Sequence, residues 1–239
     1  VVDVGAHVGA FALYAAALGH RVVAYEPVPL HAALLDASAR RLNDFGERVR
    51  VRRVAVGAEA RRGARFVSVE HGNRGASHVD VGIGDVRGAE HTAHVTVDIV
   101  TLDDELYASG ADVALLKVDA EGYERCVLRG ARRLLDAHRV RAVFVELTVR
   151  EHYAGAAAER RCLNGTSAAL LDYMYDRGYA LALESQPGAT MSRHVAHVWL
   201  SAVQQPAFGD NPQADVIFWP AASPHGNAIA TARAAGARA

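Results

Sequence analysis

The stretch Val1-Val2-Asp3-Val4-Gly5-Ala6-His7-Val8-Gly9 decides the fold of this chain. Residues 1–4 are apolar except for Asp3, and the apolar run 10–18 follows the second glycine. An apolar run of strand length, a glycine-containing turn and a helical pattern predict a buried strand, a tight turn and a helix. The free amides at the start of such a helix offer a binding site for negative charge.

The same alternation of strand-length apolar runs and helical patterns continues to about residue 178, which predicts βαβ units and a mainly parallel sheet. The predicted strands are 1–4, 21–25, 49–56, 113–118, 140–147, 179–183, 195–202 and 216–219, and the predicted helices are 10–18, 30–43, 121–137 and 164–177. Short β-like pieces at 66–69, 77–81 and 93–100 predict an inserted antiparallel ribbon or lid. We expect one domain over 1–220 and a disordered Ala/Gly/Arg-rich tail over 221–239.

Composition narrows the class of protein. The chain has 239 residues, of which 51% are apolar and 22% charged, as expected of a globular protein with a substantial core. The formal net charge of -1 provides no overall field for nucleic acid or an anionic membrane. Apolar runs such as 11–18 are shorter than the roughly 20 residues of a membrane-spanning helix, so no span is expected.

Cys126 and Cys162 are the two cysteines. They cannot form a four-ligand zinc site alone and offer at most one disulfide, so a reduced, cytoplasmic compartment is the plain expectation. The chain begins without methionine inside a predicted strand, and we therefore expect an upstream segment that could include a targeting sequence.

The turn after the first strand does not match the dinucleotide pattern Gly-x-Gly-x-x-Gly, because His7 and Ala10 stand where the second and third glycines belong. It reads instead Asp3-x-Gly5-x-His7-x-Gly9, and Glu26 ends the next strand 23 positions after Asp3. That is about the separation at which such folds place a ribose-binding carboxylate. The two acids suit a ligand with a cationic amine and a ribose diol, as in S-adenosylmethionine.

At this point the sequence resembles the FkbM-type family of class I methyltransferases. The matching blocks occur in the family's order: Val2 to Gly9, Ala24-Tyr25-Glu26-Pro27, Thr101-Leu102-Asp103-Asp104, Leu116 to Glu124, Val127 to Ala131, and Val145-Glu146. The resemblance covers about residues 1–147. The family usually carries Asn at the position of His7.

The resemblance implies a Rossmann-like, seven-stranded, mainly parallel sheet with an antiparallel last strand and helices on both faces. It also implies S-adenosyl-L-methionine as the cofactor and methyl transfer to oxygen or nitrogen, with O-methylation of a small-molecule or sugar hydroxyl expected. The residues expected to bind the cofactor are Asp3, Gly5, Ala6, His7, Gly9, Glu26 and Pro27.

Three further acids are candidates for the acceptor end of the site. Asp119 ends the central apolar strand next to the switch point where open α/β sheets bind ligands, and Glu121 follows it. Glu146 interrupts the apolar run of the following strand, which is costly unless the strand end opens into a site. Helix capping is the alternative role for Asp119, Glu121 and Glu124. We name Asp119, Glu121 and Glu146 as the catalytic candidates.

Several other polar residues have structural interpretations. For Asp103 and Asp104, helix capping is favoured over lining the pocket. The pairs His91/His94 and His194/His197 are expected to bind no metal, because on strands a spacing of three places the two side chains on opposite faces. His152 is expected at the surface more than as a base. Asn164-Gly165-Thr166 fits a glycosylation sequon or, preferably, a helix N-cap.

Two rival functions remain. A nicotinamide-dependent oxidoreductase is weakened by the broken glycine pattern and by the lack of a Tyr-x-x-x-Lys set. A non-catalytic cofactor-binding or scaffold domain with the same fold would bind the cofactor without turnover. No sequence feature specifies the acceptor, a nucleic-acid partner is not expected, and the oligomeric state is left open.

Overall fold

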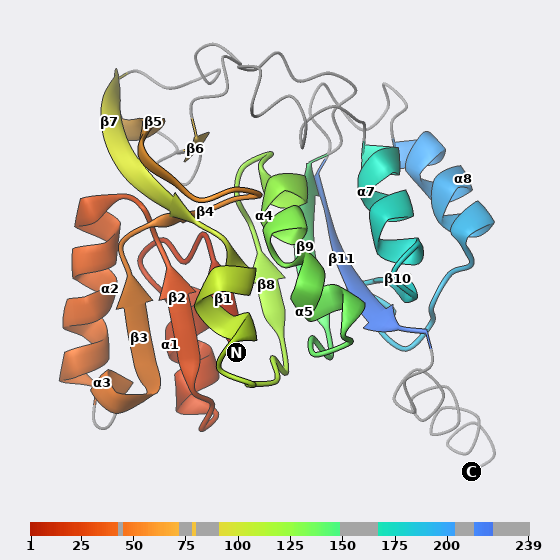
Figure 1. The fold of residues 1–239 in the computed structure, drawn as a ribbon, viewed down its shortest axis with the longest axis horizontal. Helices are drawn as coiled ribbons and strands as arrows, with labels where there is room; N and C mark the ends of the chain where they lie inside the picture. The colour runs from red at the N-terminus through yellow and green to blue at the C-terminus, as the bar shows by residue number, and fades with distance from the viewer. Residues whose placement is uncertain (43–44, 72–77, 80–90, 149–166, 204–212, 222–239) are drawn as a thin grey trace.

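The computed structural model describes residues 1–42, 45–71, 78–79, 91–148, 167–203 and 213–221. A seven-stranded sheet with the order β10-β11-β9-β8-β1-β2-β3 forms its centre (Figure 1). In chain order the strands are β1 (Val2–Val4), β2 (Val22–Tyr25), β3 (Val49–Arg52), β8 (Leu116–Val118), β9 (Val143–Thr148), β10 (Tyr179–Leu183) and β11 (Gln213–Pro220). Neighbouring strands are parallel except at β11, which runs antiparallel to both β10 and β9.

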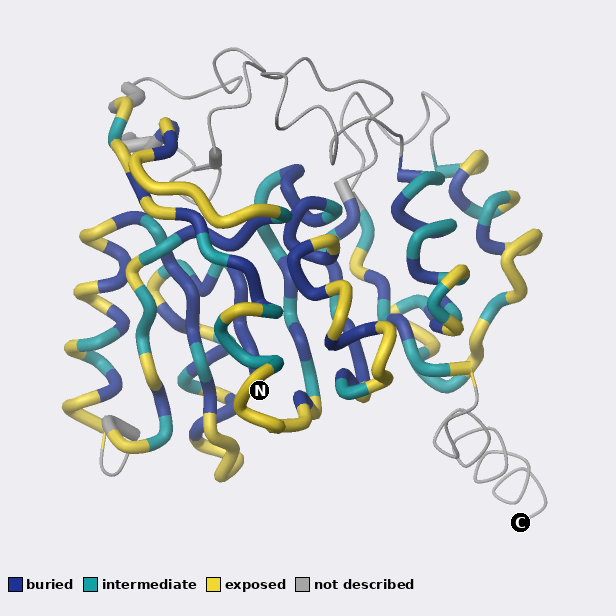
Figure 2. The backbone as a smooth tube through the Cα atoms, in the orientation of Figure 1, coloured by how far each residue is buried: buried dark blue, intermediate teal, exposed yellow. Residues whose placement is uncertain are grey.

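Helices cover both faces of this sheet, because successive residues of each strand point to opposite sides. On one face, Val22 and Ala24 of β2 pack with α1 (Ala10–Ala17) and α2 (Pro29–Arg41). On the other, Val2, Val4, Leu116 and Val118 join the larger core with α4 (Glu124–Gly130), α5 (Arg132–Asp136), α7 (Ser167–Tyr175) and α8 (Arg193–Val203). Burial accordingly follows the strands and the inner faces of the helices (Figure 2). The predicted fold class is confirmed.

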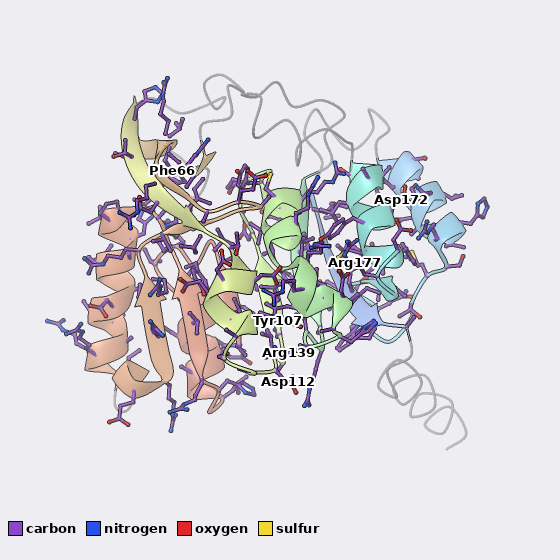
Figure 3. All side chains as sticks on the ribbon, in the orientation of Figure 1. Phe66, Tyr107, Asp112, Arg139, Asp172 and Arg177 are labelled. Carbon is purple, nitrogen blue, oxygen red and sulfur yellow. The ribbon has the colours of Figure 1, made fainter. Side chains whose placement is uncertain are left out.

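The segment between β3 and β8 forms a second sheet with the order β4-β7-β5-β6. Its strands are β4 (Ala55–Val56), β5 (Arg61–His71), β6 (His78–Val79) and β7 (His91–Val100), and β5 pairs antiparallel with both β6 and β7. Phe66, whose side chain is labelled in Figure 3, is buried in this sheet and belongs to the larger core. The second sheet is therefore anchored to the domain by apolar packing.

The predicted strand over 195–202 is wrong, because this segment lies in α8. Val195, Val198 and Trp199 favoured a strand on β propensity, but Ala196 and Leu200 are the buried residues. Their spacing of four places both on one helix face, which packs against α7. The antiparallel partner of β10 and β9 is β11 instead, and it is longer than the predicted strand over 216–219.

Two predicted elements are divided in the structure. The helix expected over 121–137 begins only at Glu124, because Glu121 (φ 52) and Gly122 (φ 93) adopt left-handed backbone conformations, and it breaks at Ala131 (φ -105). The strand expected over 49–56 is divided because 49–52 pairs with β2, whereas 55–56 pairs with β7 of the second sheet. The chain changes sheet between these two pairings.

Cys126 is fully buried in α4. Cys162, His152, the 164–166 sequon and residues 222–239 of the tail expected over 221–239 lie outside the described residues. Within the described part of the chain, no helix has the length and apolarity needed to cross a membrane.

Candidate functional site

The loop after β1 requires glycine for steric reasons. Gly5 has φ +75, and a Cβ atom built on it would lie 1.7 Å from the carbonyl oxygen of Asp119. Gly9 has φ +94, and a Cβ there would lie 2.1 Å from Cδ1 of Leu35. Real Cβ atoms do not approach other atoms so closely, so a side chain at Gly5 would displace backbone atoms, and one at Gly9 would displace the Leu35 side chain. The loop after β1 thereby comes into direct backbone contact with the end of β8.

Glu26 fixes the same loop from the end of β2. Its Oε2 accepts a hydrogen bond from the backbone N–H of His7, and its Oε1 accepts one from the N–H of Val28, each at 2.8 Å. The residue is 4% exposed. A carboxylate oxygen can accept two hydrogen bonds, so each oxygen keeps acceptor capacity for a ligand hydroxyl.

His7 occupies the centre of the loop with φ 49, a conformation that is uncommon outside glycine. Its ring packs edge-on against the ring of His31, with 4.1 Å between the centroids. Its Nε2 is buried and has no hydrogen-bond partner among the described residues. Burial and the neighbouring His31 lower the pKa of His7, which favours a neutral imidazole.

The structure places Asp3 beneath the loop. Asp3 is 0% exposed, and its two carboxylate oxygens accept no hydrogen bond from the described residues. The nearest opposite charge is the ammonium of Lys117, whose Nζ lies 3.4 Å from Asp3 Oδ1. Burial raises the pKa of Asp3, and Lys117 opposes that rise. Asp3 therefore lies at the cofactor end with Lys117 as its nearest positive charge.

Lys117 connects the end of β1 with the end of β8. Its Nζ donates to the carbonyl oxygen of Gly5 at 3.1 Å and to Asp119 Oδ2 at 3.0 Å. Burial alone would lower the pKa of Lys117, but the charges of Asp3 and Asp119 outweigh it and raise this pKa. The side chain is therefore a buried, charged ammonium between two carboxylates.

The three acids named from sequence for the acceptor end lie together. One carboxylate oxygen from each of Asp119, Glu121 and Glu146 lies within 4.8 Å of the other two, and all three residues are partly exposed. Asp119 and Glu121 follow β8, whereas Glu146 is in β9. Such a cluster has the oxygen ligands that a divalent cation uses, but carboxylates also cluster without one, and we assign no metal to it.

Ionising all of these neighbouring acids at neutral pH would cost free energy. Burial raises the pKa of Glu146 to about 8, with additional contributions from its hydrogen bond to Asp119 and from the charges of Asp119, Glu121 and Asp215. Asp215, which pairs with Glu146 in register across β11 and β9, also has a raised pKa, caused first by burial and then by Glu184. The raised pKa favours the protonated form of Glu146, which is hydrogen-bonded to Asp119.

The loop that carries Asp119 and Glu121 is organised by Glu124. Glu124 Oε1 accepts hydrogen bonds from the N–H groups of Ala120 (3.1 Å) and Gly122 (2.8 Å). Burial raises the pKa of Glu124 to about 7 in spite of these bonds. The alternative proposed for this acid from sequence, a role at the helix start, agrees with its contacts.

The remaining sequence candidates lie elsewhere. The carboxylate of Asp103, in η2 (Asp103–Tyr107), accepts from the N–H groups of Arg133 and Leu134 and so caps α5. His197, now on a helix, contacts Asp172 with Nε2 2.9 Å from Oδ1. Arg139 is labelled in Figure 3. Its guanidinium lies over the Tyr107 ring and donates a hydrogen bond to the backbone carbonyl oxygen of Tyr107. These contacts are structural.

Sequence reasoning missed Lys117. A charged residue inside the run Ala114-Leu115-Leu116-Lys117-Val118 is costly to bury unless it is paired, which is the argument that singled out Glu146. The spacing of two from Lys117 to Asp119 also places them on the same side of β8. Both signals were present in the sequence.

The strand order, the glycine loop after β1 and the acid after β2 define an α/β fold of the class I methyltransferase type. The sequence model described as "Methyltransferase FkbM domain" matches residues 3–181. The chain belongs to this family, which confirms the resemblance found in the sequence.

Solved structures with similar folds include a methyltransferase FkbM from Methylobacillus flagellatus KT, with 18% identity and a TM-score of 0.49 over 91% of this chain. This chain covers 42% of that protein's length. The [4+2]-cyclase SpnF is 13% identical with a TM-score of 0.40, over 91% of this chain and 74% of its own. Among curated proteins, none matches the sequence.

Proposed function

We propose that the chain binds S-adenosyl-L-methionine at the loop after β1 and transfers its methyl group to a hydroxyl of a small molecule or sugar. The observation that carries the proposal is the carboxylate of Glu26 at the end of β2, which is held in place by the backbone N–H groups of His7 and Val28. A carboxylate at this position is suited to a ribose diol. Membership of the FkbM methyltransferase family supports the same conclusion.

The residues of the cofactor end fit such a ligand. Gly5 and Gly9 let the loop after β1 pack directly against Asp119 and Leu35, which fixes the shape of the loop at the cofactor end. Glu26 retains acceptor capacity for hydroxyl groups. Ala6, His7 and Pro27 lie along the same two loops, and we assign them to the walls of this site.

Bound S-adenosylmethionine supplies an activated methyl group on a positively charged sulfonium. The acceptor oxygen forms the new bond to the methyl carbon as the sulfur–carbon bond breaks, and the hydroxyl proton must leave. We assign to Asp119, which accepts a hydrogen bond from Lys117, the role of taking that proton, and to Glu146, whose pKa burial raises to about 8, the role of donating a hydrogen bond. General-base help of this kind contributes about 10² to 10⁴ in rate.

Most of the acceleration in this proposal comes from positioning. Holding two reactants in line is worth up to roughly 7 to 11 kcal/mol of the barrier in well-oriented cases. The backbone contact between Gly5 and Asp119 fixes the cofactor end against the acceptor end. Glu121, in its left-handed conformation at φ 52, belongs to the acceptor wall.

The test is calorimetric titration of the chain with S-adenosylmethionine and with its demethylated product, S-adenosylhomocysteine. Glu26→Gln keeps the shape of the side chain but removes its charge. Loss of a hydrogen bond to a charged group costs about 1.5 to 3 kcal/mol, so we expect affinity to fall roughly 10-fold to 150-fold. Glu59→Gln, at an exposed position, is the matched control and should leave binding unchanged.

If the folded wild-type chain binds neither compound, the proposed cofactor is wrong. If Glu26→Gln binds as tightly as wild type, the ribose assignment is wrong although the cofactor stands. Binding followed by methyl transfer to a hydroxyl compound, detected with cofactor labelled in the methyl group, supports the whole proposal. Binding without transfer to any of a panel of sugars and phenols identifies the non-catalytic alternative.

A further inference from the structure

Lys117 is the one lysine of the chain, whereas arginine supplies the other 25 of its 26 basic residues. Its side chain is 11% exposed and lies inside a central strand of the sheet. The ammonium of lysine is a compact point charge, whereas the guanidinium of arginine is a broad planar fork. The position that holds the single lysine is therefore one where a small cation has to fit between neighbouring groups.

The register of the sheet explains which groups surround it. Asp3 of β1 pairs directly with Lys117 of β8, so the two side chains share one face of the sheet. Asp119 lies two residues after Lys117 and returns to that same face. The Gly5 carbonyl completes the set, because the backbone after β1 lies against the backbone after β8.

The contacts of the ammonium are divided between the two ends of the site. Asp3 and Gly5 belong to the cofactor end, and Lys117 Nζ lies 3.4 Å from Asp3 Oδ1 and 3.1 Å from Gly5 O. Asp119 belongs to the acceptor end and lies 3.0 Å from the same nitrogen. Among the described residues, neither oxygen of Asp3 accepts a hydrogen bond, so the charge of Lys117 is the principal compensation for Asp3.

We propose that Lys117 is a positioning residue for methyl transfer, whose ammonium joins the cofactor loop after β1 to the acceptor carboxylates and orients Asp119, the acid that takes the acceptor's proton. This inference rests on the proposed function. The cation contacts Asp119 directly, whereas Glu146 is on the next strand, where burial and then its hydrogen bond to Asp119 raise its pKa. The ammonium therefore acts on the two carboxyl groups through Asp119.

Asp119 and Glu146 form a pair of neighbouring carboxyl groups. The charged and titratable groups that act on this pair come from every neighbouring element. They are Asp3, His7 and Glu26 from the β1 and β2 ends, Lys117, Glu121 and Glu124 from β8 and its loop, and Asp215 and Glu184 from β11 and the end of β10. His7 is favoured in its neutral form by burial. Lys117 is the cation that touches Asp119, so its removal should change the titration of the pair more than any other single substitution.

The first test uses the single lysine as its own probe. Lysine labelled with ¹³C at Cε gives one side-chain signal in the intact chain, and its chemical shift reports ionisation of Lys117 without cofactor or acceptor. We expect this signal to titrate above the ordinary lysine range of about 10.4. Asp119→Asn should move the titration to lower pH, whereas Asp36→Asn, in α2 and paired with Arg40, should not.

The second test follows the carboxyl carbons of Asp119 and Glu146 by ¹³C spectroscopy in wild type, Lys117→Met and Lys117→Arg. Removing an adjacent opposite charge raises a carboxyl pKa by about 1 to 3 units, so in Lys117→Met the first deprotonation of the pair should shift upward by that amount. A residue with a structural role alone would lower thermal stability without this shift. Lys117→Arg should restore the titration in part, because it keeps the charge but not the compact shape.

The results separate the two proposals. An ordinary lysine titration that ignores Asp119→Asn, or a pair that titrates alike in wild type and Lys117→Met, overturns the role of Lys117 even if S-adenosylmethionine binds. A raised lysine titration in a chain that binds neither S-adenosylmethionine nor S-adenosylhomocysteine keeps the electrostatic link but removes its assignment to methyl transfer. If Lys117→Met does not fold, the wild-type lysine titration and its response to Asp119→Asn decide the question.

Discussion

Replacing Gly5 with alanine tests whether the end of β1 and the end of β8 are in the close contact that the structure describes. The added Cβ would lie 1.7 Å from Asp119 O and 2.9 Å from the carbonyl carbon of the same residue. Both are backbone atoms, so no side chain can rotate away to relieve the overlap. Either the loop or the end of β8 has to move.

Two terms set the expected loss in the free energy of unfolding for Gly5→Ala. A non-glycine residue in a left-handed conformation costs about 1 to 2 kcal/mol, which applies at φ +75. Overpacking against a rigid backbone adds about 1 to 3 kcal/mol. We therefore expect Gly5→Ala to lower the free energy of unfolding by about 2 to 5 kcal/mol, which in a chain of this length is roughly 4 to 20 °C in Tm.

Gly19→Ala is the matched control. Gly19 has φ +89, but a Cβ added there would meet no heavy atom within 4 Å, so this substitution carries the conformational term alone. We expect a loss of about 1 to 2 kcal/mol for this variant. Urea unfolding followed by circular dichroism measures both variants against wild type. Equal losses for Gly5→Ala and Gly19→Ala would refute the close contact between Gly5 and Asp119.

Two further predictions concern buried polar groups. Glu124 has a pKa of about 7 in the folded chain, against an ordinary value of 4.5. Between pH 4.5 and 7 the folded chain therefore binds more protons than the unfolded chain, so the contribution of Glu124 makes the free energy of unfolding fall as the pH rises. We expect the free energy of unfolding, measured with urea at pH 4.5 and 7.5, to decrease by about 3 kcal/mol less in Glu124→Gln than in wild type. The same decrease in both proteins would contradict the raised pKa of Glu124. Tyr179→Phe should lose about 1 to 3 kcal/mol, because its hydroxyl donates to the buried Val140 carbonyl at 2.8 Å. Tyr14→Phe, at a 65% exposed position, should change stability by less than about 0.5 kcal/mol, and equal effects of the two substitutions would count against the bond.

The parallel part of the fold follows from local patterns. Residues 1–4, 22–25 and 116–118 are apolar except for Asp3 and Lys117, each run is followed by glycine or an acid, and such runs are typical of strands in a sheet covered on both faces. The error at α8 has the opposite cause. Over 195–202 the β-branched and aromatic residues indicate a strand more strongly than the two buried positions, Ala196 and Leu200, indicate a helix. Tertiary packing against α7 nevertheless stabilises the helix.

The candidate acids could be found from sequence because each interrupts or ends an apolar strand. Asp119 and Glu146 come from different strands, and the register that brings them together depends on β8 and β9 being neighbours, which the order of the chain indicates. The partner of Asp3 could not be found in this way. Asp3 and Lys117 are separated by most of the first half of the chain, and their pairing exists only because β1 lies beside β8 in the sheet.

That neighbourhood gives the site its electrostatic character. Along the face that carries Asp3, the strand ends bring Lys117 together with Asp119, Glu146 and Asp215, so acids outnumber bases among the described side chains there. An excess of carboxylates raises the pKa of its members, as at Glu146, and it attracts a cation. The proposed sulfonium cofactor brings a positive charge to the loop at Gly5, and transfer of its methyl group removes that charge as the acceptor releases a proton. In the proposed reaction the carboxylates would stabilise the bound cofactor before methyl transfer and the released proton after it, while Lys117 would keep their repulsion from separating the two loops.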